Sequence, residues 1–296
     1  MSIGMDWQCY LCHMRRNIEN ARAMGTDKQV TEFSRRLMEL YLSMPEGASS
    51  PAVAPGTNRL FQEIFGAPED RFAAEKAESN RFVMERLEQI RVCTESAADP
   101  VYAGLQMAVL GNYIDFSALQ GEVSFEKLED MLQKALQMEL DRQVYHRLRQ
   151  ELSTARRLLY LTDNAGEIGF DRIFAEQLQK AYPQLQITFC VRGGPAQNDA
   201  TRADAAAVGI PFPVIDNGNT VPGTELSLLG EEAKQALAEA DVILSKGQGN
   251  AETLLGCGYN IYYAFLIKCP RFIRRFQKPK LTPMLVRERG DNGPLV

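Results

Sequence analysis

The sequence predicts an α/β protein with an all-helical N-terminal domain, followed by a three-layer α/β/α domain with a mostly parallel open sheet. Two observations lead to this class. Residues 7–156 carry helical spacings of apolar side chains and no alternating strand pattern. From Arg157 onward, short apolar runs alternate with helix-forming stretches, which is typical of βα units. We therefore expect a helical cap domain at 1–156 and a catalytic domain at 157–296.

The N-terminal half is expected to be a series of helices. Residues 27–44 place apolar side chains at helical intervals, and residues 69–94 have the pattern of one long helix. Between them, the Pro and Gly content of residues 49–57 predicts a loop. Further helices are expected at residues 12–23, 59–65, 101–110, 125–140 and 143–155.

The C-terminal half is expected to hold a parallel sheet. Its strands are expected at residues 158–161, 185–191, 212–215, 241–244 and 260–267, and its helices at 168–180, 201–208, 226–238 and 252–257. Strands that alternate with helices in this way lie parallel, because each helix returns the chain to the starting edge of the sheet.

Composition narrows the function. The net charge of −5 argues against a general nucleic-acid binder, and no apolar run has the length of a membrane span. The N-terminus lacks the pattern of a signal peptide, so we expect a cytoplasmic protein in which the six cysteines are reduced thiols. The chain has only two histidines, so a metal would bind mainly to oxygen ligands. The oligomeric state stays open.

Polar residues follow the expected strands at three turns. Asp163 and Asn164 come after the first strand, with Gly166 and Glu167 close behind. Asp163 alone is compatible with a simple helix cap, but a carboxylate beside an amide also suits a hard divalent cation. Parallel strands bring their C-terminal turns together, so Asp199, from the turn after the second strand, is expected near Asp163.

The third turn adds a positive charge. Lys246 follows the expected strand at residues 241–244, and Gly247 and Gly249 come directly after it. A lysine in a glycine-rich turn suits a phosphate group, although a solvated loop lysine is an equally good interpretation. The order of lysine and glycines differs from that of a P-loop, which disfavours a GTPase or kinase.

These motifs together resemble the damage-control phosphatase family, also known as domain of unknown function 89. The resemblance rests on Asp163-Asn164-Ala165-Gly166-Glu167, Asn198-Asp199-Ala200-Thr201, Lys246-Gly247-Gln248-Gly249-Asn250 and Gly111-Asn112-Tyr113-Ile114-Asp115. Cys9-Tyr10-Leu11-Cys12 is similar to the short, mostly prokaryotic subgroup. Each motif is weak alone, but their order and spacing along nearly the whole chain make a specific signal.

The resemblance implies a metal-dependent phosphatase that hydrolyses phosphomonoesters of small metabolites, damaged products or sugar phosphates among them. Its cofactor would be a divalent ion: Mg²⁺, Mn²⁺, Co²⁺ or Ni²⁺. The implied metal ligands are Asp163, Asn164 and Asp199, and the implied catalytic residues are Asp163, Lys246 and Glu167. The implied phosphate and substrate contacts are Asn112, Asp115, Lys246, Gly247, Gly249 and Asn250. The expected partner is a small phosphorylated metabolite, with neither nucleic acid nor membrane.

Several alternatives remain at this stage. Direct attack by water is favoured over attack by Asp163, because a second acid two residues later, typical of phosphatases with an Asp nucleophile, is absent. Other functions to weigh are an S-adenosylmethionine-dependent carboxyl methyltransferase and a non-catalytic phosphometabolite-binding protein. Cys9 and Cys12 form either a redox pair or a structural pair packed against the helical core.

Overall fold

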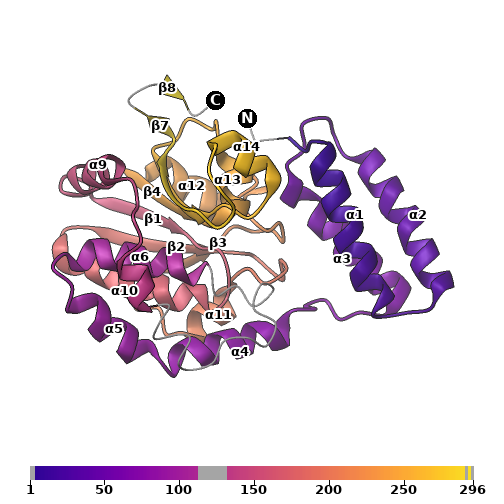
Figure 1. Ribbon diagram of the computed structural model, residues 1–296, viewed down its shortest axis with the longest axis horizontal. Coiled ribbons are helices and arrows are strands. Elements are labelled where there is room, and N and C mark those ends of the chain that lie inside the picture. The colour runs from indigo at the N-terminus through magenta and orange to yellow at the C-terminus, as the bar shows by residue number, and fades with distance from the viewer. Residues whose placement is uncertain (1–3, 113–131, 291–292, 295–296) are drawn as a thin grey trace.

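The structure is a computed structural model that describes residues 4–112, 132–290 and 293–294. Its N-terminal region is helical, with α1 (Trp7–Arg22), α2 (Asp27–Ser43), the short 3₁₀ helix η1 (Ser50–Val53) and α3 (Ala54–Phe65). Thr26 and Gln29 form a capping box that begins α2. These helices enclose a small core around Phe33, Leu37 and Phe61, and Figure 1 shows them grouped together beside the sheet.

The expected loop at residues 49–57 was wrong, because η1 and α3 occupy most of it. Pro51 and Pro55 both lie in the first turn of their helices. A proline is tolerated there because the first backbone N–H groups of a helix have no intrahelical partner. The Pro and Gly content predicted a loop at these residues, but in the structure the prolines lie at the beginning of two helices.

The next helices are α4 (Ala73–Met84), α5 (Leu87–Glu95), α6 (Pro100–Gly111) and α9 (Arg142–Leu152). The expected single helix over residues 69–94 was wrong, because the chain turns between α4 and α5. Arg86 leaves the helical region there, and its guanidinium lies 3.9 Å from the ring centroid of Phe82. No glycine or proline marks this break, so the sequence carried no signal for it. The expected helix at 125–140 lies partly outside the described residues.

The sheet of the described chain has the order β3-β2-β1-β4-β5-β6. Its strands are β1 (Arg157–Leu161), β2 (Gln186–Val191), β3 (Val214–Asp216), β4 (Val242–Lys246), β5 (Ile261–Leu266) and β6 (Pro283–Arg287). The first five strands are parallel to their neighbours, as expected, and β6 pairs antiparallel with β5. The sequence did not predict β6. The short strands β7 (Arg289–Gly290) and β8 (Gly293–Pro294) pair with each other.

Helices cover both faces of this sheet. They are α10 (Glu167–Ala181), α11 (Arg202–Ala207), the 3₁₀ helix η2 (Leu226–Leu228), α12 (Glu231–Glu239), α13 (Gly247–Leu254) and α14 (Pro270–Phe276). Along β1, Leu158 and Tyr160 join the core with α6, α9 and α10, whereas Leu159 and Leu161 join the core with α12, α13 and α14. A strand turns successive side chains to opposite faces, so this alternation confirms the three layers visible in Figure 1.

Helices α6 and α9 pack directly on the sheet layer. Leu105 and Tyr145 belong to the same buried cluster as Leu158 and Phe174. The division of the chain at residue 156 stays a prediction. In the part of the chain that the structure describes, no helix is both long enough and apolar enough to cross a membrane.

The strand order reverses between β1 and β4. The chain leaves β1 toward α10, on one face of the sheet, and leaves β4 toward α13, on the other. At such a switch point the two connections diverge and open a crevice outside the carboxyl ends of the strands. The turns that carry Asp163 and Gly247 lie at this point.

We expect Leu105→Ala to lower the free energy of unfolding by about 2–5 kcal/mol, because it leaves a cavity in the buried contact between α6 and the sheet layer. Urea denaturation measures the change. The matched control is Leu42→Ala on α2, where the leucine is 86% exposed and the expected change is within about 0.5 kcal/mol. Equal losses in both variants would contradict the assignment of this core.

Candidate functional site

The turns after β1 and β2 are joined by their backbones. The N–H of Ala200 donates to the carbonyl of Asp163 over 2.7 Å, and the N–H of Ala165 donates to Asn198 over 2.9 Å. A β-bridge also pairs Asn164 with Asp199. The structure therefore brings Asp163, Asn164 and Asp199 together at the ends of two adjacent parallel strands, as the sequence led us to expect.

The carboxyl group of Asp163 is buried and lies among other acids. Its Oδ2 atom accepts hydrogen bonds from Asn112 Nδ2 (2.7 Å) and Asn164 Nδ2 (2.9 Å). Burial, followed by the charges of Glu167 and Asp199, raises the pKa of Asp163 well above its ordinary value. A nearby cation would reverse this effect, since it favours the ionised carboxylate.

The donor set around Asp163 fits a hard cation. Asp163 and Asp199 supply carboxylate oxygens. The NH₂ group of Asn164 donates to Asp163 and Glu167, so its Oδ1 atom is the part of the amide that is able to bind a cation. Within the described ranges, no three His, Cys, Asp or Glu side chains are grouped to hold a metal. A metal at this point would therefore need the amide oxygen as well as the carboxylates, with water or substrate completing its coordination.

Asp199 forms an ion pair with an arginine that was not predicted from the sequence to be part of the site. Arg192 is buried at the end of β2, and its Nε atom donates to Asp199 Oδ2 over 2.6 Å. Its Nη2 atom donates to the carbonyl of Thr162 and to Asn250 Oδ1. This guanidinium links the turn after β2 to the turns after β1 and β4, and it orients Asp199.

Lys246 is the last residue of β4 and is fully buried. Its ammonium donates to the carbonyl of Ala108 (2.8 Å), to Glu167 Oε1 (2.8 Å) and to Asp171 Oδ1 (2.7 Å). The structure thus places Lys246 behind Glu167, with its hydrogens used inside the protein. Direct contact with a phosphate would require one of these bonds to break.

The charges around Lys246 are strongly coupled. Burial lowers the pKa of Lys246. The carboxylates of Asp171 and Glu167 raise it by a larger amount, so the pKa of Lys246 lies above its ordinary value. Burial raises the pKa of Asp171 to about 7, although the charge of Lys246 opposes this. Asp171 was not predicted from the sequence. Its position four residues after Glu167, on the same side of α10, was the available signal.

Gly247 begins α13, so the glycine-rich segment expected as a flexible loop is the first turn of a helix. Its φ of +79° favours glycine, and a Cβ atom at this position would overlap the carboxyl group of Asp163. The absence of a side chain lets the N-terminus of α13 lie against that carboxyl, where the helix dipole stabilises negative charge. Gly249 lines the cavity described below.

Asn250 and Asn112, which were expected to contact the substrate, form hydrogen bonds within the protein. Asn250 is buried, with its Nδ2 atom donating to the carbonyls of Thr162 and Lys246 and its Oδ1 atom accepting from Thr224 and Arg192. Asn112, at the end of α6, donates to both Asp163 and Glu167. These two asparagines therefore hold the acids and turns in place. Asp115 lies outside the described residues.

A cavity of about 1020 Å³ opens in front of the acids. Its walls come from α1, η1, α3, the segment at residues 69–72 and the loops that follow the strands. Asp163, Asn164 and Asp199 form part of its lining, together with Lys268 from the loop after β5. Lys268 lowers the pKa of Asp163, which indicates that its positive charge acts on that carboxyl.

Cys9 and Cys12 also line this cavity. One interpretation of the sequence had them packed against the helical core, and their position in the cavity wall differs from it. Cys9 is half-buried, and burial raises the pKa of its thiol although Arg271 lowers it. Cys12 is exposed. The structure describes both as free thiols.

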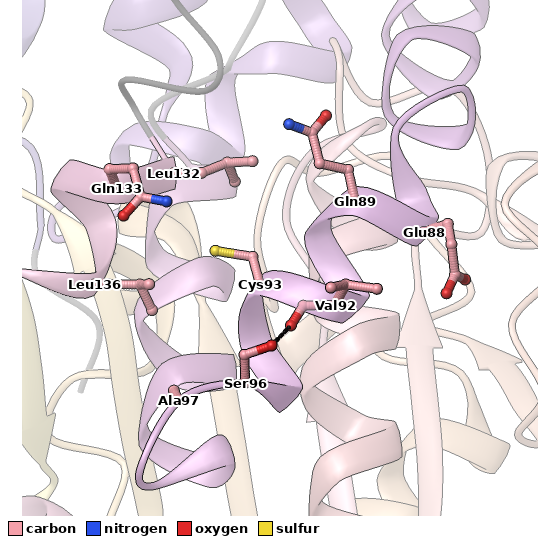
Figure 2. Close-up of a pocket in the computed structure, with 9 residues that line it drawn as sticks. All are labelled: Glu88, Gln89, Val92, Cys93, Ser96, Ala97, Leu132, Gln133 and Leu136. Atoms are coloured by element: carbon pink, nitrogen blue, oxygen red, sulfur yellow. Dashed lines mark hydrogen bonds between the residues drawn. The ribbon is translucent and has the colours of Figure 1, made fainter.

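A second cavity, of about 530 Å³, lies between α5 and residues 132–136, away from the acids (Figure 2). Figure 2 shows Cys93 beside Leu132 and Leu136. It also shows the hydrogen bond that the Ser96 hydroxyl donates to the carbonyl of Val92. Glu88 is the charged residue among its described lining residues, and none of these is a cation. It therefore lacks the groups that bind phosphate.

An open, mostly parallel sheet with buried acids and amides at its switch point defines an α/β enzyme that acts on a small polar ligand. Comparison with known proteins gives the family. Residues 5–281 match the Damage-control phosphatase ARMT1-like domain, and the chain belongs to this family. The resemblance stated from the sequence is therefore confirmed, and the family supports a phosphatase function.

Individual relatives agree with this assignment. A damage-control phosphatase of Archaeoglobus fulgidus is 32% identical over 254 residues, which cover 83% of this chain and 85% of that protein. A damage-control phosphatase of Pyrococcus horikoshii is 34% identical over 180 residues, covering 60% of this chain and 61% of that one. The crystal structure of a DUF89 family protein from Pyrococcus horikoshii superposes with a TM-score of 0.84 at 27% identity, covering 97% of this chain and 99% of that one.

We expect Gly247→Ala to lower the free energy of unfolding by about 1–3 kcal/mol, because it forces a side chain into the left-handed region and against Asp163. Thermal or urea denaturation measures the loss. Gly249→Ala is the control: its Cβ would meet the carbonyl oxygen of Pro222 at 3.0 Å, without a positive φ, so the loss should be smaller. If Gly249→Ala proves the more damaging change, the proposed contact of Gly247 with Asp163 is wrong.

Lys246→Met should lower the free energy of unfolding by about 3–5 kcal/mol, because it removes the cation between two buried carboxyls. Lys180→Met is the matched control, since the Lys180 side chain is 60% exposed in its ion pair with Glu95 and such pairs contribute about 0–1 kcal/mol. Chemical denaturation at neutral pH compares the two. A Lys246→Met variant of unchanged stability would speak against the structural role.

Proposed function

We propose that this protein is a metal-dependent phosphatase that hydrolyses phosphomonoesters of small metabolites, sugar phosphates among them. The observation that carries the proposal is the juxtaposition of Asp163, Asn164 and Asp199 on one cavity wall. Membership of the damage-control phosphatase family supports the reaction class. A small phosphorylated metabolite is the proposed partner, and a cytoplasmic location stays a prediction.

In this proposal, Asp163, Asn164 and Asp199 hold one divalent ion: Mg²⁺, Mn²⁺, Co²⁺ or Ni²⁺. Such an ion, when bound, supplies Lewis-acid stabilisation of the charge on the transferring phosphoryl group. The raised pKa of Asp163 supports this role, because a carboxyl among buried acids gains most from a cation. Arg192 keeps Asp199 oriented through their 2.6 Å bond.

Two further groups would act on the phosphate. Lys268 lines the cavity and exerts its positive charge on Asp163, so it is the proposed cation for the phosphate oxygens. Gly249, in the first turn of α13, lines the same wall. Backbone N–H groups at a helix N-terminus favour an anion.

Lys246 is assigned an indirect role. It holds Glu167 and Asp171 by ion pairs of 2.8 and 2.7 Å, and Asn112 fixes the other oxygen of Glu167. In the proposed mechanism these groups orient Asp163 and Asn164 while water attacks the phosphorus. The ester P–O bond breaks, the organic part leaves as an alcohol that takes a proton from the water, and inorganic phosphate is released. Both amide donors to Asp163 bind its Oδ2 atom, an arrangement that suits a fixed ligand. Trapping of an acyl-phosphate on Asp163 would overturn direct attack by water.

We expect hydrolysis of p-nitrophenyl phosphate to stop after chelator treatment and to return with one or more of Mg²⁺, Mn²⁺, Co²⁺ and Ni²⁺. Asp163→Asn should lower kcat/KM by about 10³-fold, because it removes a charged group that holds the ion. The matched control is Asp27→Asn, at an exposed position of α2, which should leave the rate unchanged. Failure of every metal to support turnover of any phosphoester would rule out the proposed reaction.

A further inference from the structure

Arginine side chains from the helical region line the cavity. Arg16 comes from α1, and Arg71 comes from the segment between α3 and α4. Asp163 and Asp199, in contrast, come from the loops at the strand ends. Figure 1 shows α1 and α3 beside the sheet, with strand-end loops directed toward them. The strand-end side of the cavity therefore carries these acids. Its helical side carries these arginines, together with the carboxylates of Glu19, which is paired with Arg15, and Glu69.

Arg71 is held in a defined position. Its guanidinium carbon lies 3.5 Å from the ring centroid of Phe61 and 5.7 Å from that of Phe72. Stacking on an aromatic face uses the flat side of the guanidinium and leaves its N–H edge for an anion. Among the described residues, neither Arg71 nor Arg16 forms an ion pair with a carboxylate. Arg15, one residue away on α1, is by contrast paired with Glu19 at 2.9 Å.

The positive charges of this wall act on one another. Burial lowers the pKa of Arg71, and the charge of Arg16 lowers it further. Burial and Arg16 together lower the pKa of His13, another cavity residue, to about 4. His13 is therefore neutral at pH 7, and the two arginines repel each other. An anion bound between them would relieve that repulsion and form charge-assisted hydrogen bonds.

We propose that Arg16 and Arg71 form a second anion subsite, and that the substrate is a phosphomonoester whose organic part carries another anionic group, a phosphate or a carboxylate. The inference rests on the proposed function for the position of the first phosphate. A cavity of about 1020 Å³ exceeds the needs of one phosphate group and accommodates a small metabolite that reaches both walls. The charge of Glu75 offsets part of the repulsion at Arg71, and a substrate with one charged end would leave the remainder without a bound anion.

The kinetic test compares three substrates: a hexose 1,6-bisphosphate, 3-phosphoglycerate and p-nitrophenyl phosphate. Arg71→Met keeps the apolar contact with Phe61, and Arg16→Gln changes an exposed position that the fold does not need. Each variant should raise KM at least 10-fold for the bisphosphate, the phosphoglycerate or both, and change KM and kcat for p-nitrophenyl phosphate less than 2-fold. The control is Arg22→Gln, at an exposed position of α1 outside the cavity lining, which should leave all three substrates unaffected.

The two doubly anionic substrates distinguish a second phosphate from a carboxylate, and an effect on either one supports the subsite. Equal changes for all three substrates, or no change for the doubly anionic ones, would overturn it. Arg16→Gln gives the answer even if Arg71→Met fails to fold.

A binding measurement separates this inference from the proposed reaction. Calorimetry in the presence of Mg²⁺, with Asp163→Asn to prevent turnover, should show tighter binding of the hexose 1,6-bisphosphate than of the hexose 6-phosphate. Adding Arg16→Gln should abolish the difference. If the wild-type protein hydrolyses no phosphoester but this preference persists, the reaction is wrong and the anion subsite stands. If hydrolysis is observed without the preference, the subsite is wrong and the reaction stands.

Discussion

The buried ammonium group of Lys246 is the interaction on which the arrangement of the site depends. It joins three elements that are far apart in the sequence: β4 through Lys246 itself, α10 through Glu167 and Asp171, and α6 through the carbonyl of Ala108. Removing three ionisable groups from water is costly unless each is well paired. The network meets this requirement for Lys246 and Glu167. Asp171 accepts through Oδ1 alone, and its buried Oδ2 atom has no hydrogen-bond partner in the described structure. The shared ammonium still ties α10 to β4 and α6.

The orientation of the acids follows from that constraint. Glu167, once held by Lys246, receives hydrogen bonds from Asn112 and Asn164, and the same two amides bind Asp163. The turn of Asp163 lies where the strand order reverses, and Gly247 lets α13 begin directly beside its carboxyl. The switch point thus provides the crevice, and a buried hydrogen-bond network holds the residues that line it.

Family membership and residue geometry contribute different information. The match to the Damage-control phosphatase ARMT1-like domain supports the reaction class, and the high structural similarity to a DUF89 family protein supports the fold. The contacts distinguish two groups of residues in the site. Asp163, Asn164 and Asp199 line the cavity, whereas Lys246 and Asn250 are buried and form hydrogen bonds inside the protein. The helical region contributes Arg16 and Arg71 to the cavity lining, where we propose that they select the substrate.

The sequence by itself determined the fold class, the family and the gathering of Asp163 with Asp199. The fold class and the gathering of the acids follow from apolar periodicity and from the rule that parallel strands end at one edge. The family follows from the resemblance of short motifs, Asp163-Asn164-Ala165-Gly166-Glu167 among them. Only the tertiary structure decided that Lys246 is buried, that Arg192 orients Asp199 and that α1 contributes Arg16 to the cavity lining. The physical reason is that burial and pairing of a charge depend on groups distant in the chain: Lys246 meets the carbonyl of Ala108 across 138 residues. The break between α4 and α5 and the strand β6 were likewise set by packing that no local pattern records.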